Sequence, residues 1–383
     1  MLGGIVVFLA LAAISMWSTR LTGNASFRGA SVAAVALFWS ALLLRGNVDT
    51  SQRILPVAAV APTQISATPW LCPFPRKNVS CTARERALRA LEDESVVLCL
   101  WDDNSGGHAE QLSQVNKPTI FSWDRSCDPG QVSSLFALTS NTHLDRTAAC
   151  CSRDTYKVFI ATEPPAIQPE LYETMARVAH IFDIVLSLAG PDVFTAPNVV
   201  HWPWGSSWVP LADWRVYPKT RLCSIIASNQ RYAPGHKLRH EAVAMLQEAG
   251  FDCDVLGRGY KTIASKKDGL ADYMFSIVIE NSISGFYMTE KIIDALAVGT
   301  VPVYWGNPAA PTLFGEGVIP WSSLAELKAL LPLLTPHRYA ALTSHIAANV
   351  ERARAFAPPE QWLWHNIFEC AYSWLKENPG VCE

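Results

Sequence analysis

The chain has 383 residues; half of them are hydrophobic, 17% are charged, and the formal net charge is −3. This length is too great for one small core and fits about two domains. Because the net charge is small and no basic cluster stands out, the sequence lacks the electrostatic footprint of a nucleic-acid-binding protein. We therefore expect no nucleic-acid partner.

The N-terminal region is the apolar part of the chain. Residues 2–17 and 30–44 are almost entirely apolar, and Arg20 and Arg28 lie between them. Each run is shorter than the ~20 residues that comfortably span a bilayer. The pattern is compatible with a hairpin whose arginine-bearing linker is cytoplasmic, with a single signal anchor, or with a cleaved signal peptide. We expect residues 1–45 to be a membrane anchor of one or two short helices, with the remaining chain in the secretory lumen.

Residues 46–93 are expected to form a stem or linker, because their first half combines several prolines with small residues. Cys72 and Cys81 bracket the glycosylation sequon that begins at Asn78. A second close pair of cysteines, Cys370 and Cys382, brackets the C-terminus. Close pairs that flank short loops are disulfide candidates in an oxidising compartment.

The other cysteines do not predict a metal site. The sequence has no Cys-x2-Cys pair to combine with histidines, so zinc ligation is not indicated. Cys223 and Cys253 fall in predicted core strands, where a free buried thiol is the expected state. The disulfide connectivity of the whole chain cannot be read from the spacing.

Residues 94–215 alternate strand-like and helix-like pieces. We predict strands at 95–101, 156–161 and 184–188, and a helix after Pro169. The tryptophan-rich passage 201–208 closes this half. Its rings are suited to line a sugar-binding cleft, or they form the core of a domain junction; the sequence leaves both interpretations open.

The second half, 216–345, repeats this alternation. A strand at 222–227, a helix at 237–249 and a strand at 251–256 form a βαβ unit. Such alternation predicts an α/β fold with a parallel, doubly wound sheet in each half. The aromatic tail, 346–383, is helix-like and is expected to pack back across the domains.

Residues 275–308 carry the most specific pattern. A buried strand at 275–279 is followed by a polar loop, by a helix that Thr289 caps, and by a strand that begins at Thr300. Glu290 and Lys291 therefore lie in the first turn of a helix beyond the carboxyl end of a parallel strand. Ligands collect at such ends, and the free N–H groups of a helix start suit a phosphate.

This segment resembles the donor-binding signature of the family-10 glycosyltransferases, the α1,3/α1,4-fucosyltransferases. The shared motifs are Glu280-Asn281, Tyr287, Thr289-Glu290-Lys291, Val301-Pro302-Val303 and Gly306-Asn307-Pro308. The resemblance implies a GT-B-like fold: two Rossmann-type lobes with the active site between them.

The resemblance extends to Ser228-Asn229 and to Arg239, seven residues before a helical leucine. It implies that Arg239 and Lys291 bind the donor diphosphate; the planar guanidinium fork suits bidentate contacts to phosphate. The loop 230–237 is longer than in well-known members, so Arg231 or Lys237 is an alternative to Arg239. The full set of donor-binding residues implied is Ser228, Asn229, Arg239, Asn281, Tyr287, Glu290 and Lys291.

Glu163 is the candidate catalytic base. It follows the strand 156–161 directly, and Pro164 holds it extended and outside any helix. In the family, a glutamate after such a strand of the acceptor lobe is the base that takes the proton of the acceptor hydroxyl. The resemblance therefore assigns Glu163 to general base catalysis.

A metal is not expected. Asp252-Cys253-Asp254 has the Asp-x-Asp spelling of metal-dependent transferases, but it lies inside a predicted strand, where both carboxylates share one face at the surface. Side-chain cations take the place of the metal in our interpretation. We expect no cofactor, with GDP-fucose as the donor substrate.

Together these patterns predict an inverting, metal-independent enzyme that moves fucose from GDP-fucose to a glycan or glycoprotein hydroxyl, anchored in the Golgi or an equivalent membrane. Two alternatives remain: the same fold with another nucleotide sugar, and a membrane-bound carbohydrate-binding scaffold without catalysis.

Overall fold

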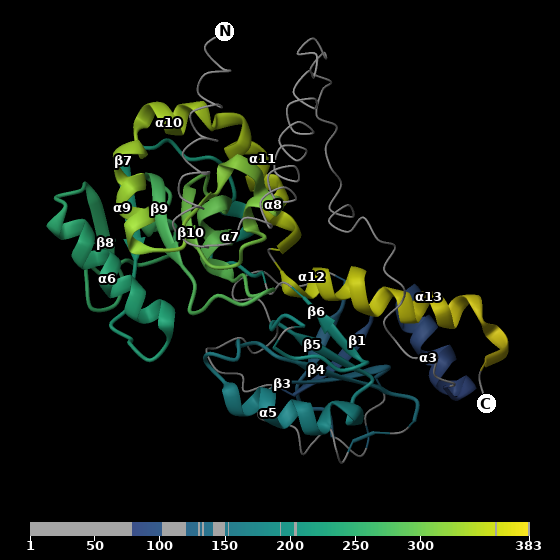
Figure 1. The fold of residues 1–383 in the computed structure, drawn as a ribbon. Coiled ribbons are helices and arrows are strands. Elements are labelled where there is room, and N and C mark those ends of the chain that lie inside the picture. The colour runs from purple at the N-terminus through teal and green to yellow at the C-terminus, as the bar shows by residue number, and fades with distance from the viewer. Residues whose placement is uncertain are drawn as a thin grey trace, which may run out of the picture. The chain divides into compact units, whose positions relative to one another are not determined.

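The computed structural model describes residues 79–381, except for 102–119, 129–130, 132–133, 141–149, 152, 192, 203–204 and 357. Two parallel sheets organise this part of the chain (Figure 1). We call the six-stranded sheet with its helices the first lobe and the five-stranded sheet with its helices the second lobe. The predicted anchor, 1–45, lies outside the described residues. Among the helices that are described, none is both long and apolar enough to cross a membrane.

The first sheet has the strand order β2-β1-β3-β4-β5-β6, and every pairing is parallel. All residues of β3 and β5 are buried, as expected for strands that helices cover on both faces. The predicted strands at 95–101, 156–161 and 184–188 are confirmed as β1, β4 and β5. The bounds are β1 Val97–Trp101, β2 Ser122–Asp124, β3 Phe136–Ser140, β4 Tyr156–Ile160, β5 Ile184–Ser187 and β6 Val199–His201.

Helices α5 (Pro169–Val178) and α3 (Cys81–Glu92) belong to the first lobe. The second of them differs from the expectation, because residues 81–92 fall in the segment predicted to be a stem or linker. The hydroxyl of Ser80 accepts a hydrogen bond from the N–H of Ala83 and so caps the helix. Ala87 on its inner face is buried in the core of the first lobe. The helix is therefore part of the folded lobe.

The second sheet has the order β11-β10-β9-β7-β8, again with parallel pairings. The predicted βαβ unit is present, although α6 begins three residues earlier than expected because Pro234 occupies its first turn. The bounds are β7 Arg221–Ile226, α6 Pro234–Glu248, β8 Cys253–Leu256, β9 Tyr273–Ile279, α7 Glu290–Ala297, β10 Val301–Trp305 and β11 Ile319–Pro320.

The C-terminal helices serve both lobes. Val350 and Ala353 of α11 pack in the core that contains α7, whereas Phe368 and Tyr372 lie in the core of the first lobe. The tail thus packs back as expected, and α13 runs beside α3 (Figure 1). The bounds are α8 Ala310–Phe314, α9 Leu324–Leu330, α10 Pro336–Ala341, α11 Thr343–Ala353, α12 Pro359–Leu363 and α13 Glu369–Glu377.

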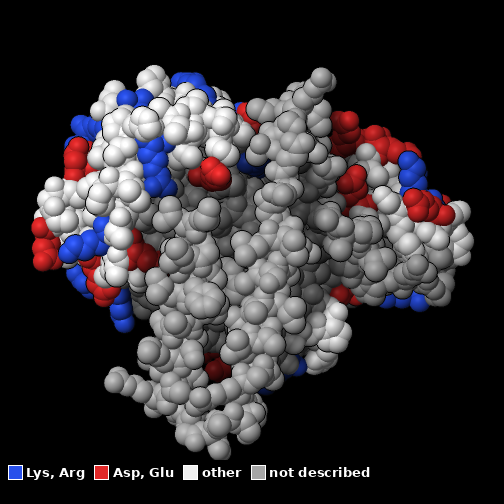
Figure 2. Space-filling model, turned by 45° about the horizontal axis from the view of Figure 1, so that its top comes forward, with Lys and Arg blue, Asp and Glu red and all other residues white. Residues whose placement is uncertain are grey.

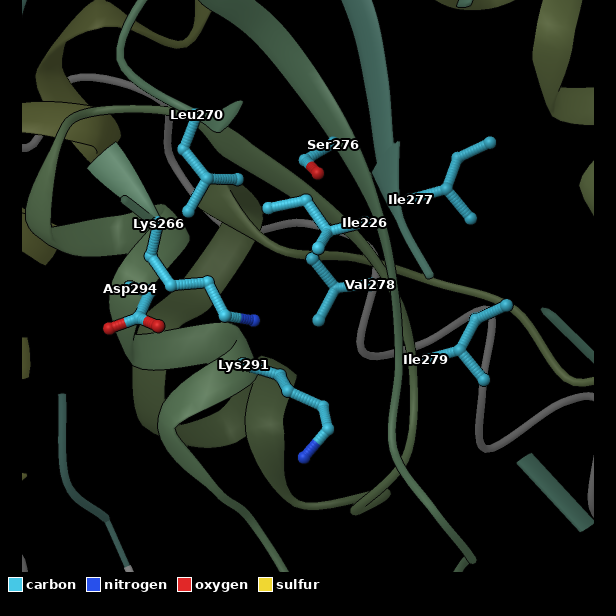
Figure 3. Close-up of a pocket in the computed structure, with 9 residues that line it drawn as sticks. All are labelled: Ile226, Lys266, Leu270, Ser276, Ile277, Val278, Ile279, Lys291 and Asp294. Atoms are coloured by element: carbon cyan, nitrogen blue, oxygen red, sulfur yellow. The ribbon is translucent and has the colours of Figure 1, made fainter. Parts of the chain in front are cut away.

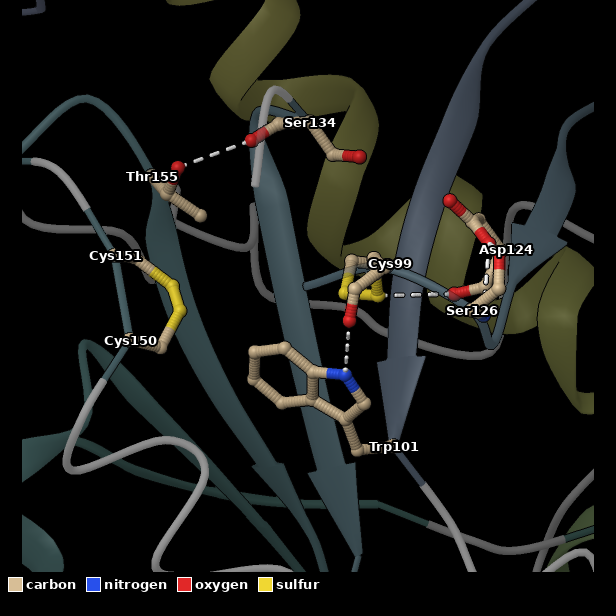
Figure 4. Close-up of a disulfide and its surroundings, with 9 residues drawn as sticks. Cys99, Trp101, Asp124, Ser126, Ser134, Cys150, Cys151 and Thr155 are labelled. Carbon is tan, nitrogen blue, oxygen red and sulfur yellow. Dashed lines mark hydrogen bonds between the residues drawn. A yellow bond between two sulfur atoms is a disulfide. The ribbon is translucent and has the colours of Figure 1, made fainter. Parts of the chain in front are cut away.

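The first lobe contains two disulfides near Trp101, Cys99–Cys127 and Cys150–Cys151 (Figure 4). Cys81 and Cys370 are also disulfide-bonded. Their predicted partners, Cys72 and Cys382, lie outside the described residues, so those pairings stay predictions. Two further cysteines have free thiols in neighbouring strands of the second lobe, as expected: Cys223 and Cys253.

Acidic and basic side chains are interspersed over the described residues that are visible in Figure 2. No large area of one sign is visible among them. This distribution on the visible face fits the small net charge of the chain.

Candidate functional site

A buried carboxylate fixes the entry to helix α7. The side chain of Glu280, fully buried at the end of β9, accepts hydrogen bonds from the N–H of Thr289 (2.9 Å), the hydroxyl of Thr289 (2.7 Å) and the hydroxyl of Tyr304 (3.3 Å). Thr289 in turn caps the helix by accepting from the N–H of Lys291. The cap predicted from the sequence is therefore present, and Glu280 holds it in place.

Lys291 lies among oxygens at this helix start. Its Nζ is 3.0 Å from Thr289 Oγ1, 3.1 Å from Glu290 Oε1 and 3.5 Å from Glu280 Oε2. Burial alone would lower the pKa of Lys291, but the two carboxylates outweigh it and the pKa is raised. Burial would likewise raise the pKa of Glu290, yet the ammonium groups of Lys291 and Lys266 hold it at about 2. Both groups are therefore charged at neutral pH.

Arg239 is the second cation of the site. Its side chain is buried, and it donates through Nε to Ile279 O (3.0 Å) and through Nη2 to Asn281 Oδ1 (2.9 Å). Burial lowers the pKa of the guanidinium, while Glu280 and Glu290 oppose this shift. The structure thus brings Arg239, Asn281, Glu290 and Lys291 to one end of the second sheet, as the motifs predict.

The other predicted residues between β7 and the first turns of α6 make fewer contacts at this site than Arg239. Ser228 contacts Gln230 at 3.4 Å, and Asn229 is exposed. The two alternatives to Arg239, Arg231 and Lys237, are also exposed. Among these cations only Arg239 joins the network with Asn281.

The start of helix α6 contacts the loop that follows β9 through its backbone. The N–H of Gly235 donates to Asn281 O at 2.8 Å, and a Cβ at this position would overlap the carbonyl of Glu280. The next residue, His236, is buried, and burial together with Arg239 and Lys291 lowers its pKa to about 4. A neutral imidazole therefore adds no charge to the site.

Glu163 extends toward this cluster from the first lobe, three residues beyond the end of β4. Burial raises its pKa to about 7; Lys291 lowers it, and Glu290 and Glu280 raise it. Its Oε2 is inaccessible to solvent and has no hydrogen-bond partner among the described residues. A carboxylate with a pKa near neutrality and an uncommitted oxygen is suited to accept a proton.

Tyr287 lies between the two lobes' functional groups. It is buried, and its hydroxyl interacts electrostatically with Glu280, Glu163, Glu290 and Arg239. Burial and the three carboxylates raise its pKa well above the ordinary value. Tyr287 is therefore neutral and remains a hydrogen-bond donor.

The Asp-x-Asp sequence belongs to a surface network. The carboxylate of Asp254 accepts from Arg221 (2.5 Å) and from the hydroxyl of Tyr273 (2.8 Å). The described residues contain no cluster of three or more His, Cys, Asp or Glu side chains arranged to hold a metal. The position of Asp254 fits the surface-strand interpretation.

The tryptophan-rich passage supports the domain-junction interpretation where it is described. Trp202 is fully buried in the core of the first lobe, and its ring lies 5.6 Å from that of Trp362. Trp208, at the other end, is 37% exposed.

A cavity of about 20 Å³ lies between α7 and the strands β7 and β9, lined by Lys266, Lys291 and Asp294 among aliphatic side chains (Figure 3). This volume holds about one water molecule and is far too small for a nucleotide. Asp294 accepts from Ser207 Oγ (2.7 Å) and Trp208 N (2.8 Å), and burial raises its pKa to about 7. The helix that carries Lys291 is thereby tied to the segment that connects the lobes.

Comparison with known proteins identifies the second lobe. Residues 216–327 match the profile of glycosyltransferase family 10 (fucosyltransferase), C-terminal domain. This segment is similar to the C-terminal domain of family-10 glycosyltransferases. The match contains Arg239, Asn281 and the Thr289-Glu290-Lys291 helix start, so the resemblance predicted from these residues is confirmed.

The relatives are distant. An α-(1,3)-fucosyltransferase of Helicobacter pylori is 32% identical over 91 residues, which are 24% of this chain and 19% of the relative. The chain thus matches about a fifth of that relative's length. A crystal structure of an α1,3-fucosyltransferase with GDP-fucose is 15% identical, with 68% of this chain and 89% of that chain covered and a TM-score of 0.44. The crystal structure of TarM is 11% identical, with 63% of this chain and 55% of that chain covered and a TM-score of 0.43.

Two contributors to the site were not assigned from the sequence. Glu280 stands in the motif beside Asn281, and an acidic residue at the end of a continuous apolar strand was a signal that could have identified it. Tyr172, whose hydroxyl donates to the backbone carbonyl of Glu163 at 3.0 Å, had no such signal, because it reads as one more apolar residue of α5.

Proposed function

We propose that this protein is an inverting, metal-independent glycosyltransferase that moves fucose from GDP-fucose to a glycan hydroxyl. The observation that carries the proposal is the cluster of Arg239, Asn281, Glu290 and Lys291 inside a family-10 domain, with Glu163 facing it. Two cations at a helix start suit a diphosphate leaving group. A scaffold without catalysis has no use for them.

Each residue then has a distinct task. Arg239 and Lys291 neutralise the diphosphate as the bond to the sugar breaks, so no metal is needed in this role. Glu290, fixed as a carboxylate, accepts hydrogen bonds from the hydroxyls of the ribose or of the donor sugar. Ser228 and Asn229 border the donor, and Tyr287 donates its hydroxyl.

The transfer itself requires a base from the lobe opposite the donor. In an inverting reaction the acceptor attacks from the face opposite the nucleotide. Glu163 in the first lobe removes the proton of the acceptor hydroxyl as the oxygen bonds to the anomeric carbon and GDP leaves. This geometry fits two Rossmann-type lobes in a GT-B-like arrangement, and the acceptor is a glycan or glycoprotein of the Golgi or equivalent lumen, with the chain anchored by residues 1–45.

A nucleotide panel tests the proposal. The purified chain is mixed with GDP, UDP, ADP or CMP in the presence of EDTA, and thermal stability is measured. A nucleotide at about 100 times its Kd stabilises the folded state by roughly 2.7 kcal/mol. Selective stabilisation by GDP, followed by fucose transfer to a glycan panel, is the expected result. Selective stabilisation by UDP would favour another nucleotide sugar, and stabilisation by none would favour a scaffold.

A further inference from the structure

The three-residue turn Ser187–Ala189, which begins at the last residue of β5, connects the two halves of the site. We call it the docking turn. All three residues are fully buried, and Ser187 closes the turn by accepting from the N–H of Ala189 at 3.1 Å. On one side of it lie Glu163 and the helix α5, and on the other lies the second-lobe loop that leads into α7.

On the first-lobe side, Tyr172 joins Glu163 to the turn. Its hydroxyl donates to Glu163 O at 3.0 Å, and Ser187 and the backbone of Ala189 are within hydrogen-bonding range of the same phenol. Burial raises the pKa of Tyr172, and these hydrogen bonds oppose the shift. The ring packs edge-on against Phe194 at 5.9 Å, so the hydroxyl is held in place by its surroundings.

On the second-lobe side, the loop before α7 docks on the same turn. Leu188 O accepts from Ser284 Oγ (3.2 Å) and from Phe286 N (3.3 Å). The ring of Phe286 stacks on His201 with centroids 5.2 Å apart, and His201 Nδ1 donates to Ala189 O at 2.6 Å. One residue after Phe286 comes Tyr287, whose hydroxyl interacts with Glu163.

We propose that Tyr172 is a positioning residue for Glu163: it fixes the backbone of the base to the docking turn, which also holds the loop of the donor helix. This inference rests on the proposed function. Its physical basis is that a general base must lie within hydrogen-bond reach of the acceptor proton, while the donor is held by a different lobe. The docking turn interacts with both sides: Ser187 and Ala189 with the phenol of Tyr172, and Leu188 with the second-lobe loop.

The surroundings of Glu163 make its position measurable. It faces Lys291 and Glu290 from α7, Glu280 from the end of β9, Tyr287 from the loop and Tyr172 from α5. Its pKa is about 7 in the folded chain, against 4.5 ordinarily. Between these values the folded state holds more protons than the unfolded state, so this group lowers stability as pH rises through that window. Glu163→Gln cannot titrate, so it removes this pH-dependent loss of stability. The free energy of unfolding of Glu163→Gln minus that of the wild type, called the pH-dependent advantage below, should therefore grow from pH 5 to pH 8.

The experiment measures this advantage by denaturant unfolding in three backgrounds: wild type, Tyr172→Phe and Tyr372→Phe. Tyr372 is the matched control, a buried tyrosine in the core of the first lobe that contacts Phe136. With Tyr172→Phe the Glu163 backbone is released toward solvent, so the pH-dependent advantage of Glu163→Gln should shrink. With Tyr372→Phe it should keep its wild-type size even if overall stability falls. An unchanged advantage in the Tyr172→Phe background overturns the proposal.

Transfer assays give the second readout. Tyr172→Phe should lower kcat about 2- to 10-fold, the range that one lost hydrogen bond implies, with the donor KM unchanged. Ser284→Ala tests the other side of the turn. The loss of kcat in the Tyr172→Phe/Ser284→Ala double variant should differ by more than about twofold from the product of the two single-variant losses. Independent effects would contradict the shared turn. If Tyr172→Phe reduces the pH-dependent advantage of Glu163→Gln but the wild type transfers no fucose, the proposed function fails and the positioning role stands.

Discussion

The two lobes contribute to the site in different ways. In the second lobe, Glu280, Thr289, Glu290 and Lys291 lie within twelve residues of sequence, and one strand and one helix place them. In the first lobe, Glu163, Tyr172 and the turn Ser187–Ala189 come from three separate elements, and only their packing brings them together. A compact motif therefore carries Lys291 and Glu290, and a dispersed set of contacts places Glu163. Substitutions in the two lobes should accordingly separate donor binding from turnover.

The largest expected effect is on turnover alone. Glu163→Gln should reduce kcat by about 10²–10⁴, the usual contribution of a general base, while the Kd for GDP stays near the wild-type value. Glu290→Gln is the comparison in the other lobe and should weaken donor binding instead. Single-turnover rates and calorimetry measure the two quantities. Normal turnover in Glu163→Gln would show that another residue is the base.

A somewhat smaller effect is expected on donor binding. Lys291→Ala should raise the Kd for GDP by about 10- to 150-fold, because a hydrogen bond to a charged group contributes about 1.5–3 kcal/mol. Lys237→Ala, which removes an exposed lysine of α6, is the control and should leave the Kd unchanged. Equal losses in both variants would point to a general electrostatic effect rather than a phosphate contact.

The pH profile distinguishes the lobes in a third way. Burial raises the pKa of Glu163 to about 7, whereas Glu290 is held at about 2. Because the base must be deprotonated, kcat/KM should rise about tenfold per pH unit below pH 7 and level off above it. GDP affinity has no such dependence on Glu290 above pH 4. A profile that is flat from pH 5 to pH 8 would contradict the assignment of Glu163.

The smallest effect is expected at the Asp-x-Asp sequence. Asp254→Asn breaks an exposed ion pair with Arg221, and such pairs contribute less than about 1 kcal/mol. Stability should change by no more than that, and activity should be unaffected and should persist in EDTA. Loss of activity on chelation, restored by Mn²⁺, would show that a metal takes part after all.

Much of the second lobe could be predicted because its signals are local. The apolar run before Glu280, the cap at Thr289 and the glycine at 299, whose φ is +71°, each specify a boundary of the strand–helix–strand unit. The same sequence order places Lys291 in the first turn of a helix, beyond the end of a parallel strand. Arg239 was assigned from the family resemblance, although its burial and its bond to Asn281 become visible only in the fold.

The first lobe shows what local signals leave out. Strands β2 and β6 have three residues each, too few for a periodic pattern, and β3 was not anticipated either. Helix α3 was expected to be linker, because a polar helix with a narrow apolar face is stabilised by the core that it covers rather than by its own sequence.

The sequence by itself determined which chemical groups are available: a capped helix start with Glu290 and Lys291, an arginine in the helix before it, and a glutamate after a strand. Only the tertiary structure decided that the glutamate faces the helix start and loses enough water for its pKa to rise to about 7. It also decided that Tyr172 and Ser284 meet at one turn, 112 residues apart in sequence (284 − 172). The reason is physical: desolvation and long-range hydrogen bonds depend on what packs around a side chain, and no local pattern encodes that surrounding.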